Sequence, residues 1–86
     1  MKTVVITGSA RGLGYELAKE FKKRNYNVVL SDILKDKLIE AKENLNNEIG
    51  NGKIISVVCD VTNENDLQNL LKEAIKNFNS VDIWIN

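Results

Sequence analysis

The chain has 86 residues, with 12 basic and 12 acidic side chains and no formal net charge, and it contains one Cys and neither His nor Pro. This length suits a single domain, and the absence of His excludes His-based catalytic dyads and triads. One Cys excludes an internal disulfide and a zinc-binding cysteine cluster, and the balanced charge argues against a nucleic-acid interface. The apolar runs are too short to cross a membrane, and no signal-peptide pattern begins the chain, so we expect a cytoplasmic domain.

The first apolar run, residues 3–7, is typical of a strand that is covered on both faces. A glycine-rich stretch, residues 8–14 (the glycine loop), follows it. Apolar residues then recur at helical spacing: Leu13, Leu17, Ala18 and Phe21. This pattern predicts a helix to about Arg24, with Asn25 in a left-handed C-terminal cap. We expect Lys22, Lys23 and Arg24 to complement the negative end of this same helix.

Residues 27–31 form the second predicted strand. A stripe of apolar residues predicts a second helix: Leu34, Leu38, Ala41, Leu45 and Ile49. Residues 50–52, Gly-Asn-Gly, end that helix and turn the chain into a third strand at residues 54–59. Thr62 suits the N-cap of a third helix that extends to Phe78. Residues 81–85 form the fourth predicted strand.

Alternating strands and helices predict an α/β fold with a parallel sheet and crossover helices. Right-handed crossovers place the first two helices on one face of the sheet. If the third helix crosses to the other face, the strand order is 3-2-1-4. The sequence therefore predicts a partial Rossmann fold, with four strands and three helices in a single dinucleotide-binding domain over residues 1–86.

The glycine loop lies between the first strand and the first helix, and this position gives it a chemical meaning. Free backbone N–H groups and the helix dipole attract a pyrophosphate at a helix N-terminus. Glycines allow the backbone to approach the phosphates and the helix to pack closely on the strand. The loop is not a nucleotide-triphosphatase P-loop, because no Gly-Lys-Ser/Thr follows its glycines.

The spacing Thr-Gly-x-x-x-Gly-x-Gly over residues 7–14 resembles the short-chain dehydrogenase/reductase family. Asp32 ends the second strand, and Asp60-Val61 follows the third, where the family places an Asp that binds the adenine ring. Residues 81–86 resemble the run that leads into the family's Asn-Asn-Ala-Gly motif, with Asn86 as its first Asn. The resemblance implies these cofactor-binding residues: Gly8, Ser9, Arg11, Gly12, Leu13, Gly14, Asp32, Ile33, Asp60, Val61 and Asn86.

Two residues with opposite charges bear on the identity of the cofactor. Asp32 follows the loop at close to the spacing expected of an acid that hydrogen-bonds the ribose hydroxyls of NAD, and its carboxylate repels a 2′-phosphate. Arg11 precedes the second glycine, where the family often uses a basic residue for NADP. Only Asp32 also gains a hydrogen bond from the unphosphorylated ribose, so we expect NAD, with NADP as the alternative.

The catalytic Ser, Tyr and Lys of the resembled family come after the fourth strand, beyond the match described above. Tyr15 and Lys19 match Tyr-x-x-x-Lys literally, but they lie on the first helix and are simple neighbours there. We therefore expect no catalytic residue and no metal site in these 86 residues. The complete family protein would transfer hydride between NAD(P) and an alcohol or ketone, whereas this chain alone would bind the cofactor weakly and be inactive.

Other interpretations remain beside this one. The chain could be a stand-alone nucleotide-binding or interaction module without catalysis, or a structural fragment that binds nothing. An Asp after the third strand also suggests a phospho-receiver, but Gly8-Ser9 occupies the place where that class needs an acidic pair. Cys59 and Trp84 are predicted to be core residues. Because the fourth strand would be an apolar edge, we also expect self-association through it or through the exposed sheet face beside it.

Overall fold

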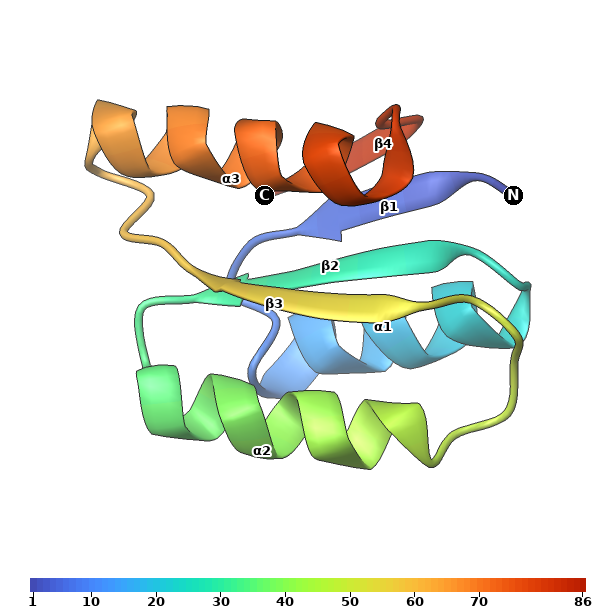
Figure 1. Ribbon diagram of the computed structural model, residues 1–86. Helices are drawn as coiled ribbons and strands as arrows, with labels where there is room; N and C mark the ends of the chain where they lie inside the picture. The colour runs from blue at the N-terminus through green and yellow to red at the C-terminus, as the bar shows by residue number, and fades with distance from the viewer.

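The computed structural model describes residues 1–86 and contains one parallel sheet with the strand order β3-β2-β1-β4 (Figure 1). This order confirms the predicted partial Rossmann fold. The elements in chain order are β1 (Thr3–Ile6), α1 (Gly12–Lys23), β2 (Asn27–Asp32), α2 (Lys35–Asn46), β3 (Ile54–Val58), α3 (Glu64–Phe78) and β4 (Ile83–Ile85).

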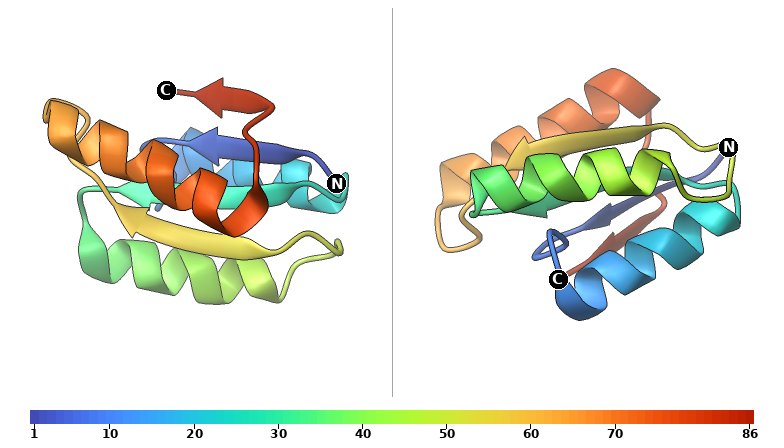
Figure 2. Two further views of the ribbon diagram at one scale, coloured as in Figure 1. Left: turned by 45° about the horizontal axis from the view of Figure 1, so that its top comes forward. Right: turned by 90° about the horizontal axis from the view of Figure 1, so that it is seen from below.

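The sheet lies between two layers of helices, with α1 and α2 on one face and α3 on the other (Figure 2). Alternate residues of the strands therefore enter two separate cores. Val4, Ile6 and Leu30 are buried with the helices of the first face, whereas Val5 and Val29 are buried with residues of α3. In register, Val4 lies beside Val28 of β2 on one side and Ile83 of β4 on the other. All four strands point the same way, so their carboxyl ends meet at one edge of the sheet.

The start of α3 differs from the prediction. Asn63, not Thr62, is the N-cap, because the Asn63 side chain accepts a hydrogen bond from the backbone N–H of Asp66 at 3.0 Å. Thr62 instead donates both its N–H and its hydroxyl to the carboxylate of Asp60. The end of α1 agrees with the prediction, since Asn25 adopts a left-handed conformation with φ of 65°.

The second helix ends earlier than its apolar stripe predicts. It ends at Asn46, and Ile49 is 76% exposed instead of facing the core. The buried side chain of Lys22 lies at this end, where its ammonium donates to the backbone carbonyls of Asn46 and Glu48. Lys22 lies in the last turn of α1, as predicted, but its ammonium satisfies the free carbonyls at the end of the neighbouring helix, which the sequence did not predict.

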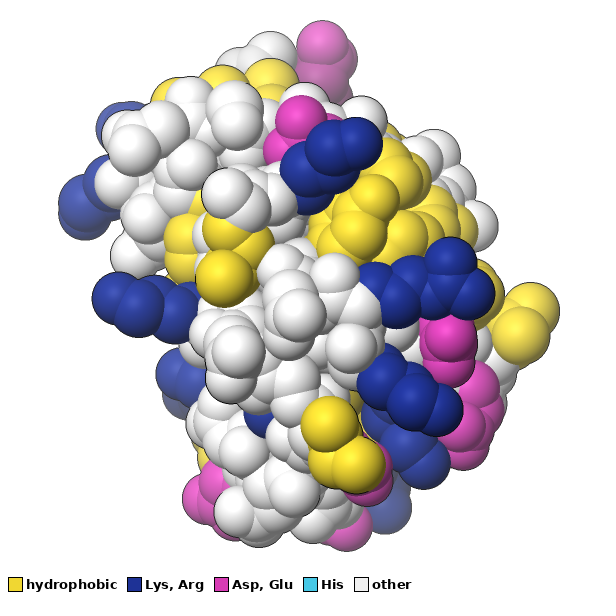
Figure 3. Space-filling view, turned by 90° about the vertical axis from the view of Figure 1, so that its right-hand side faces the viewer, with side chains coloured by type: hydrophobic (Ala, Val, Ile, Leu, Met, Phe, Trp, Pro, Cys, Tyr) yellow, Lys and Arg dark blue, Asp and Glu magenta, His cyan; other side chains and the backbone are white.

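The fourth strand is also shorter than predicted and begins at Ile83. Before it, Asp82 exchanges backbone and side-chain hydrogen bonds with Thr3. The Asp82 N–H donates to the Thr3 carbonyl at 2.9 Å, and the Asp82 carboxylate accepts from the Thr3 N–H at 2.8 Å. The side chain thus takes a donor that a longer strand would have used. Figure 3 shows this end of the molecule, where the strands begin, and hydrophobic side chains gather there beside Lys and Arg.

Candidate cofactor site

A cavity of about 260 Å³ lies at the carboxyl edge of the sheet, at the left of Figure 1. It joins segments that follow all four strands. Its lining residues are Thr7, Gly8, Asp32, Ile33, Cys59, Asp60, Val61 and Asn86. The structure thus brings together six of the residues predicted from the sequence. It adds Thr7 and Cys59, which end the first and third predicted strands and were interpreted there as strand residues alone.

The backbone of the glycine loop requires glycine at specific positions. Gly8 and Gly12 have φ of 62° and 63°, in the left-handed region that favours glycine, and open space surrounds the position of a Cβ at each. Gly14 is needed for a different reason. A Cβ there would lie 2.5 Å from the carbonyl oxygen of Gly8 and 2.9 Å from the Cα of Ser9. Gly14 therefore allows α1 to start directly against the loop.

The N-terminus of α1 presents unpaired hydrogen-bond donors. No side chain caps the helix, and its first hydrogen bond runs from the N–H of Tyr15 to the carbonyl of Arg11 at 3.4 Å. The N–H groups of Gly12, Leu13 and Gly14 accordingly have no acceptor within the chain. With the positive end of the helix dipole, these donors fit the oxygen atoms of a pyrophosphate.

Asp32 connects the loop with the start of α2. One carboxylate oxygen, Oδ2, accepts from the N–H of Ala10 at 3.1 Å. The other, Oδ1, accepts from the N–H of Leu34 at 3.1 Å. The side chain is half-buried and remains accessible from the cavity. A carboxylate at this place can accept hydrogen bonds from ribose hydroxyls.

Asp60 is held in place by its own turn. Its Oδ1 accepts from the Thr62 hydroxyl at 2.6 Å and from the Thr62 N–H at 2.9 Å. These hydrogen bonds lower the pKa of the Asp60 carboxyl below its ordinary value of 3.8, and the bond from the hydroxyl has the larger effect. Its backbone N–H donates to the Asp66 carboxylate at 3.0 Å. Asp60 is therefore an ionised, oriented acceptor, with the exposed Val61 as an apolar neighbour.

Asn86 lies at the end of β4 with its side chain fixed by two donors. Its Oδ1 accepts from the Trp84 indole N–H at 3.0 Å and from the Thr7 hydroxyl at 3.4 Å. Because an indole N–H can only donate, the carbonyl oxygen of the amide must face it. The amide nitrogen of Asn86 is thereby left to donate elsewhere at the edge of the cavity.

The other five predicted residues lie outside the cavity lining. The side chain of Ser9 is fully buried, donating to the Ile6 carbonyl at 2.8 Å and accepting from the Ser31 N–H at 2.9 Å, so its hydroxyl shapes the loop. Leu13 is 77% exposed beside the loop. Arg11 lines a neighbouring cavity of about 220 Å³ together with Tyr15 and Lys37. The remaining two, Gly12 and Gly14, contribute backbone to the loop.

Cys59 is buried, although it contributes to the lining of the cavity. Burial raises the pKa of its thiol above the ordinary value of 9.0. The thiol is therefore protonated near neutral pH, and protonated thiols are poor nucleophiles. Cys59 thus acts as a small apolar wall at the end of β3, which agrees with its prediction as a core residue.

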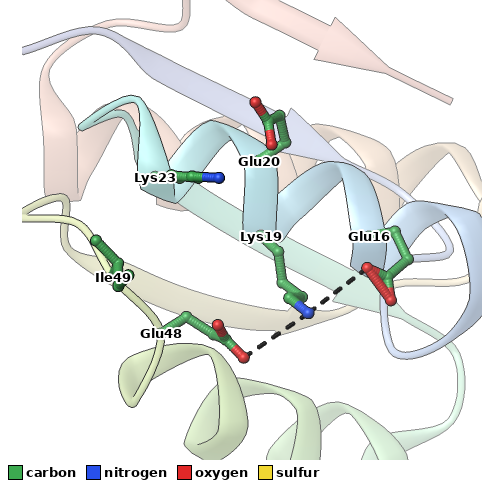
Figure 4. A pocket seen from close by; sticks show the side chains of 6 residues that line it. All are labelled: Glu16, Lys19, Glu20, Lys23, Glu48 and Ile49. Atoms are coloured by element: carbon green, nitrogen blue, oxygen red, sulfur yellow. Dashed lines mark ion pairs between the residues drawn. The ribbon is translucent and has the colours of Figure 1, made fainter.

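Neither Tyr15 nor Lys19 lines this cavity. Lys19 forms ion pairs with Glu16 at 3.7 Å and Glu48 at 3.8 Å, in a separate cavity of about 340 Å³ (Figure 4). Burial raises the pKa of the Tyr15 hydroxyl above 10.0, and the charge of Glu48 raises it further. A tyrosine that exchanges protons near neutral pH needs a lowered pKa. The pair is therefore poorly placed and poorly tuned for acid–base chemistry.

No group of three or more His, Cys, Asp or Glu side chains is arranged to hold a metal ion. None of the helices combines the length and the apolar character that crossing a lipid bilayer requires.

Comparisons with known proteins point to one family. The family model for short chain dehydrogenases matches residues 2–86. Chlorophyll(ide) b reductase NOL, chloroplastic, of Oryza sativa subsp. japonica is 40% identical over 83 residues, which are 96% of this chain and 24% of that protein. The crystal structure of hydroxysteroid dehydrogenase from Escherichia coli has a TM-score of 0.91 and 34% identity, over 99% of this chain and 34% of that one.

A short chain dehydrogenase/reductase from Burkholderia phymatum, solved in complex with NAD, has a TM-score of 0.90 and 28% identity, over 96% of this chain and 29% of that one. The chain thus spans between about a quarter and a third of the length of these relatives. The family model covers nearly every residue, and the glycine loop, Asp32 at the end of β2 and Asp60 after β3 stand where the sequence pattern placed them. This chain belongs to the short chain dehydrogenase family.

Proposed function

We propose that this chain is the NAD(P)-binding N-terminal portion of a short-chain oxidoreductase, whose complete form transfers hydride between the dinucleotide and an alcohol or ketone. One observation carries the proposal: unpaired backbone donors of the glycine loop and two carboxylates, Asp32 and Asp60, converge on the carboxyl edge of the sheet. This is the edge at which open α/β sheets bind nucleotides.

Each part of the site has a chemical role in this proposal. The first-turn amides of α1 hold the pyrophosphate, and Asp32 accepts hydrogen bonds from the adenosine ribose. Asp60 accepts a hydrogen bond from the adenine amino group, beside the apolar side chains of Ile33 and Val61. Asn86 supplies an amide donor toward the remainder of the dinucleotide. The bound nicotinamide would supply the hydride chemistry, while these residues bind and orient the dinucleotide.

We propose NAD as the preferred cofactor. The Asp32 carboxylate lies in the cavity, whereas Arg11 lines the neighbouring one. A 2′-phosphate at about 4 Å from a carboxylate is repelled by roughly 4 kcal/mol at an effective dielectric constant near 20, before salt screening reduces it. NADP is the alternative, and Arg11 with Lys37 is the group of cations that would favour it.

We further propose that the 86-residue chain alone binds the dinucleotide weakly and does not turn over substrate. The support is that Tyr15 and Lys19, which have the Tyr-x-x-x-Lys spacing, lie away from the cavity, with Lys19 paired to Glu16 and Glu48. Proton exchange with an alcohol or ketone requires a positioned acid–base side chain, and neither Tyr15 nor Lys19 is placed to supply one.

The test is a titration of the chain with NADH and NADPH, followed by calorimetry and by thermal unfolding. A ligand that binds only the folded state raises the Tm. We expect millimolar NADH to raise the Tm by several degrees and to bind more tightly than NADPH. No effect of either dinucleotide at this concentration would contradict the proposal, and tighter binding of NADPH would overturn the preference for NAD alone.

A further inference from the structure

The carboxylate of Asp32 is bonded to two segments of backbone without any ligand. It accepts from the N–H of Ala10, in the middle of the glycine loop, and from the N–H of Leu34, the N-cap residue of α2, each at 3.1 Å. Asp32 therefore fixes both the phosphate side and the ribose side of the proposed cofactor site.

The contact with Ala10 comes directly before the unpaired amides. Ser9 is attached to β2 by its N–H, which donates to the Ser31 carbonyl at 2.9 Å. The N–H of Ala10 donates to Asp32, and the following residues up to Gly14 have no hydrogen bond from their N–H groups to the chain. Ala10 lies directly before these residues, so its contact with the Asp32 side chain helps to set the path by which the backbone enters the first turn of α1.

The same carboxylate has the capacity to do this and to bind a ribose. Two carboxylate oxygens offer about four acceptor sites. The amides of Ala10 and Leu34 use one site on each oxygen, and one site on each remains for the two ribose hydroxyls. No exchange of partners is needed when the nucleotide binds.

We propose that Asp32 is a positioning residue for the glycine loop in addition to being a ribose ligand. This inference rests on the proposed function, because it concerns the same nucleotide site. It means that replacing Asp32 to favour NADP would also disorder the amides that hold the pyrophosphate. Such a replacement would then weaken the binding of both NAD and NADP.

For a ligand that lacks the ribose hydroxyls, the two roles predict opposite changes in binding affinity when Asp32 is removed. A carboxylate repels the negative diphosphate, so a residue that acted through its charge and the ribose alone would, on removal, leave binding of such a ligand unchanged or tighten it. A residue that positions the loop would, on removal, weaken it. The comparison therefore separates the roles without turnover by an enzyme.

The experiment measures the binding of ADP and of 2′,3′-dideoxy-ADP by calorimetry to the 86-residue chain and its variants. For Asp32→Ala we expect dideoxy-ADP to bind about tenfold more weakly, as expected for losing a charge-assisted hydrogen bond that orders the loop. Asp32→Asn keeps one acceptor oxygen, so it should fall between Asp32→Ala and the unaltered chain. Asp36→Asn, an exposed acid in the first turn of α2, is the charge-matched control and should change binding by less than about twofold.

Backbone amide exchange gives a second readout that needs no ligand. In Asp32→Ala, the amides of Ala10 and Leu34 should exchange at least about tenfold faster, while those of β1 keep their protection. Equal or tighter binding of dideoxy-ADP by a folded Asp32→Ala chain, or unchanged exchange at Ala10, would overturn the inference. Failure of the unaltered chain to bind ADP would instead contradict the proposed function, so the two failures are distinguishable.

Discussion

The Nζ of Lys22 on α1 lies 3.2 Å from the backbone carbonyl oxygen of Asn46, the last residue of α2. The same ammonium also donates to the Glu48 carbonyl, and the side chain is only 4% exposed. A lysine of one helix thus satisfies the free carbonyls at the end of another. It joins the two helices that cover one face of the sheet.

Replacing this ammonium should be costly. Lys22→Met keeps most of the aliphatic side chain but leaves two carbonyls without their donor. We expect the free energy of unfolding to fall by about 2 kcal/mol, the scale of lost hydrogen bonds to a charged group. Urea denaturation measures the change. Lys23→Met, at an exposed neighbouring position, is the control and should change the free energy of unfolding by less than about 0.5 kcal/mol. Equal effects of the two substitutions would contradict the assigned role of Lys22.

The loop glycines should respond differently to alanine. In Gly14→Ala the new methyl would meet the Gly8 carbonyl at 2.5 Å, so the loop must move away from the start of α1. We expect stability to fall by about 1–3 kcal/mol, as in other overpacked sites, and NADH binding to be lost.

Gly12→Ala is the comparison, because its Cβ would meet open space and only the positive φ opposes it. We expect it to cost about 1–2 kcal/mol. Calorimetric titration with NADH measures the difference between the two variants. Gly14→Ala binding NADH as well as the unaltered chain does would show that the packing at Gly14 is not required for the site.

Most of the topology could be predicted from the sequence, and the reasons are local. Continuous apolar runs such as Val28–Leu30 are typical of strands that are covered on both faces, and the glycine loop marks a strand-to-helix junction. The ends of elements were less predictable. Thr62 and Asn63 are both good N-caps, and the competing hydrogen bonds of Thr62 to Asp60 decide between them.

The candidate site divides in a similar way. The position of Asp32 and Asp60 could be predicted because each stands at the carboxyl end of a strand, and the carboxyl ends of parallel strands lie at the same edge of the sheet. The bond between Asp32 and Ala10 could not, because residues 22 positions apart carry no local pattern that joins them. The partner of Lys22 is hidden for the same reason. A lysine in the last turn of a helix suggests its own helix end, and only tertiary packing brings the end of α2 to it.

The Asp60 turn predicts a pH dependence with a definite sign. The Thr62 hydroxyl and N–H hold the pKa of Asp60 below 3.8, so the folded state favours the ionised carboxyl. The stabilisation is present above the unfolded-state pKa and is lost as the pH falls through the folded-state pKa. Thr62→Val removes the stronger of the two donors and should raise the pKa of Asp60 toward 3.8, as an NMR titration of its carboxyl carbon would show. Thr62→Ser retains a hydroxyl and should leave it low; equal values for Val and Ser would exclude the hydroxyl as the cause.

The reactivity of Cys59 should report on folding. Burial raises its pKa above 9.0, and its side chain is 2% exposed, so iodoacetamide should alkylate the native chain slowly at pH 8. In urea the thiol regains an ordinary pKa and full access, and its alkylation should be at least about a hundredfold faster, as expected when a reaction requires opening of the native state. Mass spectrometry follows the single modification. Fast alkylation under native conditions would show that the carboxyl end of β3 is open.

The last prediction concerns β4, the outermost strand on one side of the sheet. β4 is hydrogen-bonded to β1 alone, and Ile83, Trp84 and Ile85 are only half-buried. Unpaired edges of apolar strands pair readily with other chains. We therefore expect the isolated 86-residue chain to scatter light as a species larger than its 9.7 kDa monomer at high concentration.

A charge on this strand should oppose such pairing, as lysine does on natural edge strands. Ile83→Lys should shift the chain toward the monomer, although the loss of a half-buried contact will also lower its Tm. Ile39→Lys, at an exposed position on α2, is the control and should leave the oligomeric state unchanged. If the unaltered chain stays a monomer at every concentration tested, the self-association prediction is wrong.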